Sequence, residues 1–178
     1  MKIIETKEIN KNLKNGLVTP EILGYAAYSV NKRAKNWRDK EREYREQNYY
    51  FRRYNRYYDD KYNNEERARD KKEEYYKLKD SIIMMFSPIK IHSLTQWKWC
   101  VDLQEEYPVE KYFLYYEFGG FSFHHPIDST DGYKNLTIEE LDEDFETFGA
   151  DTNTLMSMQM VRKIMNGIKN GNYHVQAA

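Results

Sequence analysis

The feature that most constrains this fold is a stretch of about 60 residues that follows Pro20 and contains no further proline before about Asp80. Charged residues and strong helix formers dominate it, and Gly24 is its one glycine. Thr19 supplies an N-cap hydroxyl, and Pro20 has the fixed φ that suits the first position of a helix. One uninterrupted helix of this length would be ~90 Å long, so we expect two helices joined by a turn at residues 59–64.

Apolar and aromatic residues repeat every seven positions along this stretch. The repeated positions are Val30, Trp37, Tyr44, Phe51 and Tyr58 in the first helix and Ala68, Tyr75 and Ile82 in the second. Such a repeat places one face of each helix against a partner. We therefore predict an antiparallel, coiled-coil-like helical hairpin with aromatic residues in its seam and Asn63 as the N-cap of the second helix. A homodimeric coiled coil is the alternative.

The sequence that follows this stretch alternates with period two, as strands do. Segments 89–94 and 97–101 precede two aromatic runs, 112–118 and 121–125, which flank Gly119-Gly120. A Gly-Gly pair between two such runs predicts a β-hairpin whose turn requires positive φ.

Two helices are expected after the sheet. Thr137-Ile138-Glu139-Glu140 has the pattern of a capping box and predicts an acidic helix as far as Phe148. A last helix, roughly 152–170, carries an apolar stripe and ends at Gly171. Residues 1–18 are expected to form a short strand or arm and then a polar turn.

The predicted fold class is therefore α+β. An N-terminal long helix or helical hairpin, rich in Tyr and Arg, occupies residues 1–80. A small acidic domain with an antiparallel sheet and two C-terminal helices occupies residues 81–178.

The formal charge of −1 hides a strong asymmetry between the two parts of the chain. Residues 1–100 carry 23 basic and 15 acidic side chains, whereas residues 101–178 carry 5 basic and 14 acidic ones. Each pole builds its own electrostatic field, which indicates an interaction surface. Either the two poles attract each other, within the chain or across a dimer, or they bind a charged external partner.

The first candidate surface is the basic helix between residues 31 and 58, which contains ten basic and four acidic residues. Arginines contact phosphates, and tyrosines stack on bases, but the same two residue types are also enriched in protein hot spots. A solvated face with local ion pairs such as Glu41–Arg45 is the simpler interpretation. The candidate partner-binding residues are Arg45, Tyr49, Arg52, Arg53, Arg56 and Tyr57.

The second candidate surface is the predicted acidic helix. A row of carboxylates on one helix can imitate the phosphates of a nucleic acid. An ordinary exposed face is again the simpler interpretation. The candidate residues are Glu139, Glu140, Asp142, Glu143, Asp144 and Glu146.

The sequence contains no catalytic or metal-binding motif that we recognise. His124 and His125 are adjacent, and neighbours on a strand point to opposite faces, so they cannot share one ligand site. Cys100 is the one cysteine and lacks a nucleophile signature. We expect no enzymatic activity, no cofactor and no metal. Without a run of 18 apolar residues or a signal peptide, we expect no membrane association.

In its manner of composition the chain resembles the anti-CRISPR proteins of phages and mobile elements. The resemblance lies in its short length, its Tyr, Asn and Lys content, the charged helix over Val30–Glu41 and the compact segment Tyr115–His124. It implies a small, non-catalytic protein with helical and α+β parts, acting in the cytoplasm of the host cell.

Three functional hypotheses follow from the sequence. The first is an inhibitor that occludes a host CRISPR effector nuclease, or its guide RNA complex, by shape and charge. The second is a nucleic-acid-binding regulator that uses the basic helix. The third is a structural protein that dimerises through Trp37, Tyr44 and Phe51.

Overall fold

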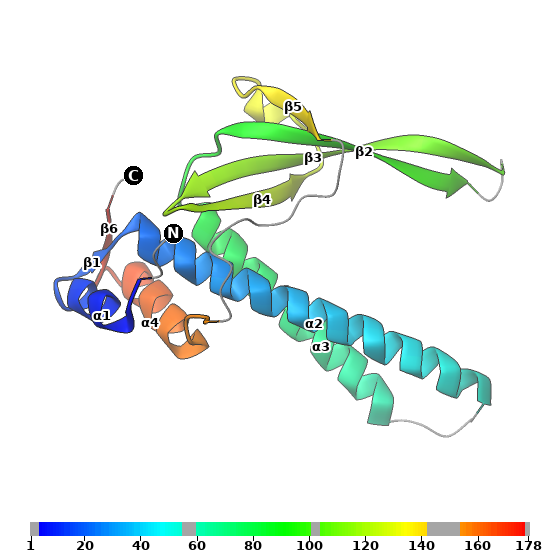
Figure 1. The fold of residues 1–178 in the computed structure, drawn as a ribbon, viewed down its shortest axis with the longest axis horizontal. Helices are drawn as coiled ribbons and strands as arrows, with labels where there is room; N and C mark the ends of the chain where they lie inside the picture. The colour runs from blue at the N-terminus through cyan, green and yellow to red at the C-terminus, as the bar shows by residue number, and fades with distance from the viewer. Residues whose placement is uncertain (1–3, 55–59, 101–103, 142–153, 177–178) are drawn as a thin grey trace.

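The computed structural model describes residues 4–54, 60–100, 104–141 and 154–176, with only the backbone described for residues 50–54 and 60–63. The described part is a mixed α+β fold, in which most of the helices precede a block of four strands and one helix follows it (Figure 1). The elements in chain order are α1 (Thr6–Lys14), β1 (Leu17–Val18), α2 (Pro20–Tyr54), α3 (Asp60–Ile83), β2 (Lys90–Cys100), β3 (Glu105–Phe118), β4 (Phe121–Ile127), the 3-10 turn η1 (Asp131–Tyr133), β5 (Ile138–Leu141), α4 (Met158–Lys169) and β6 (His174–Val175).

Helices α2 and α3 form the predicted antiparallel hairpin (Figure 1). The Thr19 hydroxyl accepts a hydrogen bond from the amide of Ile22 at 3.4 Å, which confirms the predicted cap. With 35 residues, α2 is about 52 Å long. The predicted turn at residues 59–64 is wrong in position, because α3 already begins at Asp60. Asn63 therefore lies inside α3 and is not its N-cap.

The seam of the hairpin uses only part of the stripe expected on α2, where Val30 is buried as expected. Ala34, Glu41 and Asn48, also spaced by seven, are buried, whereas Trp37 and Tyr44 are only half-buried. The small Ala34 allows the two helices to approach closely. Glu41 and Asn48 form hydrogen bonds with Lys72 and Glu65 of α3, respectively. On α3 the predicted stripe is confirmed by the burial of its three members, which are Ala68, Tyr75 and Ile82.

Strands β2 to β5 form a four-stranded sheet in the order β4-β3-β2-β5. Gly119 and Gly120 have φ of 59° and 77° and join β3 to β4, so the predicted β-hairpin is confirmed. The expected antiparallel sheet is corrected in one respect, because β5 runs parallel to β2 from Ile91↔Ile138 to Leu94↔Leu141. The sheet is mixed.

The C-terminal helices differ from the prediction. The segment 138–141 is the strand β5 and not the start of an acidic helix, and the rest of that predicted helix lies outside the described residues. The last helix exists as α4, but it begins at Met158 rather than near residue 152, because Ser157 caps it by accepting a hydrogen bond from the amide of Met160. It ends before Gly171, whose φ is +74°.

The N-terminal residues also differ from the prediction. Residues 6–14 form the helix α1, with Ile9 and Leu13 buried, instead of an arm and a turn. The short strand β1 pairs in parallel with β6, so the two ends of the described chain lie side by side. α1 and α4 pack beside the start of α2 (Figure 1).

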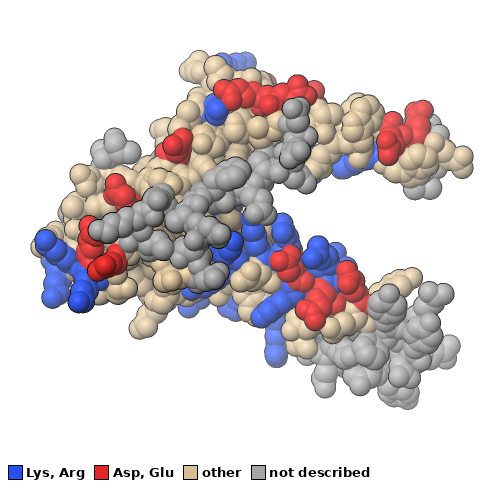
Figure 2. All heavy atoms as spheres, in the orientation of Figure 1, with Lys and Arg blue, Asp and Glu red and all other residues tan. Residues whose placement is uncertain are grey.

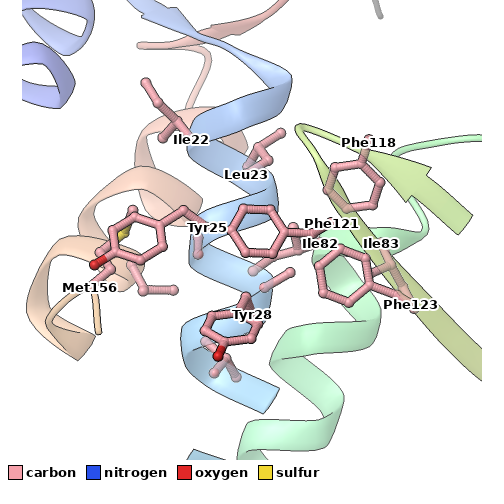
Figure 3. Packing of buried hydrophobic residues seen from close by; sticks show 14 of the residues in the cluster. Ile22, Leu23, Tyr25, Tyr28, Ile82, Ile83, Phe118, Phe121, Phe123 and Met156 are labelled. Atoms are coloured by element: carbon pink, nitrogen blue, oxygen red, sulfur yellow. The ribbon is translucent and has the colours of Figure 1, made fainter. Parts of the chain in front are cut away.

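The hydrophobic core lies where the β3–β4 hairpin meets the N-terminal half of α2 and the end of α3 (Figure 3). The rings of Tyr28 and Phe121 are 5.2 Å apart, and those of Phe118 and Phe123 are 5.0 Å apart. Gly24 permits this approach, because a Cβ there would lie 2.8 Å from Phe121. The core thus anchors one end of the sheet to one end of the hairpin and leaves their far ends apart (Figure 1).

Candidate interaction surfaces

The far half of β2 and β3 projects from the body as a two-stranded ribbon, which we define as residues 95–100 and 105–111. The described pairing of β5 with β2 reaches as far as Leu94, and pairing of β4 with β3 begins at Tyr112. Within the described chain, no third strand lies beside the ribbon. Two-stranded ribbons are marginally stable in water, so such an extension is a feature that needs a reason.

The ribbon exposes large aromatic side chains. Trp97 is 64% exposed, Trp99 59% and Tyr107 43%. Because side chains alternate along a strand, the two indoles share one face of the ribbon. Pro108 and Glu106 lie opposite them in the register, whereas Tyr107 and Lys98 form a pair on the other face.

Around these aromatic residues the ribbon is acidic. The residues that define the ribbon include three acidic residues and two lysines. Among them, Glu105, Glu106 and Glu110 are exposed on β3. Figure 2 shows acidic side chains near the projecting end of the ribbon and a hollow between the ribbon and the helical hairpin.

Sequence reasoning missed the ribbon as a surface. The alternation of Trp97-Lys98-Trp99 predicts a strand but does not by itself predict an exposed surface. One feature of the sequence does indicate exposure. Trp97 and Trp99 occupy one face of the strand, and the nearby segment from Glu105 to Tyr107 is too polar to cover that face.

The structure describes the six candidate residues of the basic helix to different extents. Arg45 forms ion pairs with Glu41 at 2.9 Å and with Glu65 at 3.3 Å, so the predicted Glu41–Arg45 pair is confirmed. Tyr49 is 63% exposed. Arg52 and Arg53 lie on α2 with only their backbone described, and Arg56 and Tyr57 lie outside the described residues. Their role in binding stays a prediction, as does a dimer through Trp37, Tyr44 and Phe51.

The predicted acidic surface is only partly within the described chain. Glu139 pairs with Lys90 at 2.6 Å, and this hydrogen bond lowers the pKa of Glu139 and raises that of Lys90. Glu140 is exposed on β5. These two glutamates belong to a strand and so do not form a helical row of charges. The other four residues, which are Asp142, Glu143, Asp144 and Glu146, lie outside the described residues.

Glu41 is the centre of a buried polar network in the hairpin seam. Its side chain is 6% exposed and accepts hydrogen bonds from Arg45 at 2.9 Å and from Lys72 at 2.6 Å. About two turns further from the core, Asn48 donates a hydrogen bond to Glu65 at 2.8 Å. Charge-assisted bonds of this length hold the two helices in one register.

Replacing Glu41 with Ala should lower the free energy of unfolding by about 1–3 kcal/mol, because Lys72 loses its carboxylate partner inside the seam. Urea unfolding followed by far-UV circular dichroism measures this. Glu43→Ala is the matched control, since Glu43 is exposed and contacts Gln47 on the same helix. Equal midpoints for the two variants would contradict the network.

Two histidines meet on the face of the sheet that points away from the helices. His92 Nδ1 and His124 Nε2 are 2.7 Å apart, close to the ring of Tyr115. His125 points to the opposite face, as predicted, where its Nδ1 lies 3.3 Å from Asp80. Burial, together with the charges of His92 and Lys79, lowers the pKa of His124 to about 3. Burial also lowers the pKa of His92.

This pair predicts a loss of stability in acid. His124 has a lower pKa in the folded state than the ordinary 6.5, so its contribution is complete above about pH 7 and is lost as the pH falls from 6.5 toward 3. We expect unfolding to become easier by about 1–2 kcal/mol between about pH 7.5 and pH 5. His124→Gln should remove that part of the pH dependence in urea titrations, and an unchanged dependence would contradict the role of His124.

Comparisons with family models, with curated proteins and with solved structures found no match for this chain. Within the described ranges, no helix is both long and apolar enough to cross a membrane. In the same ranges, no three His, Cys, Asp or Glu side chains gather where they could hold a metal ion.

Proposed function

We propose that the protein is a non-catalytic antagonist that docks its acidic, aromatic ribbon onto the basic nucleic-acid-binding surface of another protein. The observation that carries this proposal is the ribbon itself, with Trp97 and Trp99 largely exposed on one face of an extension that, among the described residues, is held by its own pairing. Tryptophan and tyrosine are the residues that most often dominate protein interfaces.

The charge of the ribbon favours a protein partner over a nucleic acid. Aromatic side chains also stack on bases, but proteins that bind single strands surround such side chains with positive charge. Here Glu106 lies opposite Trp99, and Glu110 lies further along the same face of the ribbon as the two indoles. Carboxylates would repel phosphates and would attract the lysines and arginines of a nucleic-acid channel.

The particular partner that we propose is a host CRISPR effector nuclease, alone or with its guide RNA. Such nucleases hold nucleic acid in positively charged channels. The compositional resemblance to anti-CRISPR proteins supports this choice, and so does the shape of the chain, in which a projecting ribbon and a hairpin diverge from one small core (Figure 1). In this proposal the ribbon enters the channel and occludes it.

The test is a cleavage assay with a reconstituted effector nuclease, its guide RNA and a matching DNA target. Increasing amounts of the purified protein should abolish cleavage near an equimolar ratio to the nuclease. Inhibition should weaken as salt increases, because charge steers the association.

A nuclease that needs no guide RNA, cutting the same DNA, is the control. Inhibition of both enzymes would mean that the protein covers the DNA, which contradicts the proposed target. Uninhibited cleavage by every effector type tested, at a large molar excess of the protein, would refute the proposal. Sedimentation of the free protein would then test the self-assembly hypothesis.

A further inference from the structure

The helical hairpin carries a hollow of about 310 Å³ whose lining is entirely charged. α2 contributes five of the lining residues, and α3 contributes one. They are Arg38, Asp39, Glu41, Arg42, Arg45 and Lys72. Four cationic side chains and two carboxylates therefore line one small space, which has an excess of positive charge. This space lies on the helical hairpin and is separate from the ribbon.

The cations converge because of helix geometry. Arg38, Arg42 and Arg45 stand at positions i, i+4 and i+7, which form one stripe on α2. Lys72 reaches the same place from α3. Buried Glu41 binds both Arg45 and Lys72, so this carboxylate holds two of the cations in place and is itself occupied.

The other carboxylate neutralises its neighbours weakly. Asp39 lies 3.7 Å from Arg38 and 3.8 Å from Arg42, well beyond the 2.7–2.9 Å of a charge-assisted hydrogen bond. The side chains of the two arginines are 54% and 73% exposed. Each guanidinium has five N–H donors arranged in a fork, and at these distances Asp39 accepts no hydrogen bond from either of them.

From this arrangement we propose that the hollow binds a phosphate group, supplied by the backbone of a single-stranded nucleic acid. The guanidinium fork matches the oxygens of a phosphate. The lining contains no aromatic or apolar residue, so the site would contact the backbone and would not distinguish bases. A polymer is favoured over a free phosphate ion because the surrounding segment 31–58 is itself strongly basic.

Fluorescence anisotropy with a labelled single-stranded RNA tests this directly. Arg38→Gln/Arg42→Gln should bind at least tenfold more weakly than the wild type at low salt. Loss of this one phosphate contact should also reduce the slope of log K against log salt by about 0.7.

The matched control is Arg67→Gln/Lys77→Gln, which removes the same charge from exposed positions of α3 outside the hollow. This variant should lose less than threefold in affinity. Circular dichroism confirms that both variants fold. Equal losses in the two variants would overturn the proposal, because binding would then follow net charge rather than the hollow.

A second titration distinguishes the source of the phosphate. Inorganic phosphate should displace the RNA more effectively than potassium chloride at equal ionic strength. Binding of inorganic phosphate without binding of RNA would overturn the nucleic-acid assignment. Because the ribbon is intact in all these variants, failure here leaves the proposed inhibition of a nuclease to be judged by its own assay.

Discussion

Replacing Trp97 and Trp99 together with Ala should weaken binding to an inhibited partner by more than about 100-fold while leaving the fold intact. Each indole offers about 150–250 Å² of contact area, and a hot-spot tryptophan contributes at least about 2 kcal/mol to binding. Because the two side chains are mostly exposed, their removal costs the free protein little. Titration calorimetry measures the affinity, and thermal unfolding measures the stability.

Lys98→Ala is the matched control for this variant. Lys98 lies between the two tryptophans, but its side chain is on the opposite face of the ribbon, paired with Tyr107. It should change affinity less than about threefold, and in the favourable direction if the partner surface is basic. Wild-type affinity of the double variant would exclude the ribbon face as the interface.

The parts of the fold that could be predicted are those set by local physical chemistry. Thr19 and Pro20 begin a helix wherever they occur before a run of helix formers. Gly119 and Gly120 between two aromatic runs leave few alternatives to a tight turn. The antiparallel hairpin follows from these local signals and from the length limit on a lone helix.

Other elements depend on residues that are distant in the sequence. The capping-box pattern at Thr137 favoured a helix, but pairing with β2 and the ion pair between Glu139 and Lys90, 49 positions apart, place the segment in a strand. Glu41 lies in the seam although it is charged, because its partner Lys72, 31 positions away in the sequence, reaches it from α3. Tertiary contacts outweigh local propensity in both cases.

The exposed face of the ribbon also could not be predicted from the local sequence, because it depends on how distant strands pair. Trp97 and Trp99 in an alternating strand normally belong to a core. Within the part of the chain that the structure describes, their exposure follows from where the pairing of β4 and β5 stops, which depends on the sheet and not on the segment alone. The sequence predicts the basic helix, but it does not predict the hollow, because the lining of the hollow includes Lys72 from α3.

Gly119→Ala should be the most destabilising of three otherwise similar glycine replacements. A Cβ at Gly119 would lie 2.3 Å from the carbonyl oxygen of Pro20 and 2.7 Å from the Cα of Glu21. Both neighbours are backbone atoms at the start of α2, so they cannot rotate away, and φ of +59° adds strain. We expect a loss of at least about 3 kcal/mol in the free energy of unfolding.

Two controls separate the causes of this loss. Gly171 has φ of +74° but open space around a new Cβ, so Gly171→Ala should show only the backbone strain, about 1–2 kcal/mol. Gly132 has open space and no positive φ, so Gly132→Ala should change stability by less than about 0.5 kcal/mol. Urea unfolding ranks the three variants. If Gly119→Ala lost no more than Gly171→Ala, the β3–β4 turn would not rest against the first turn of α2, and the anchoring of the sheet to the hairpin would have to lie elsewhere.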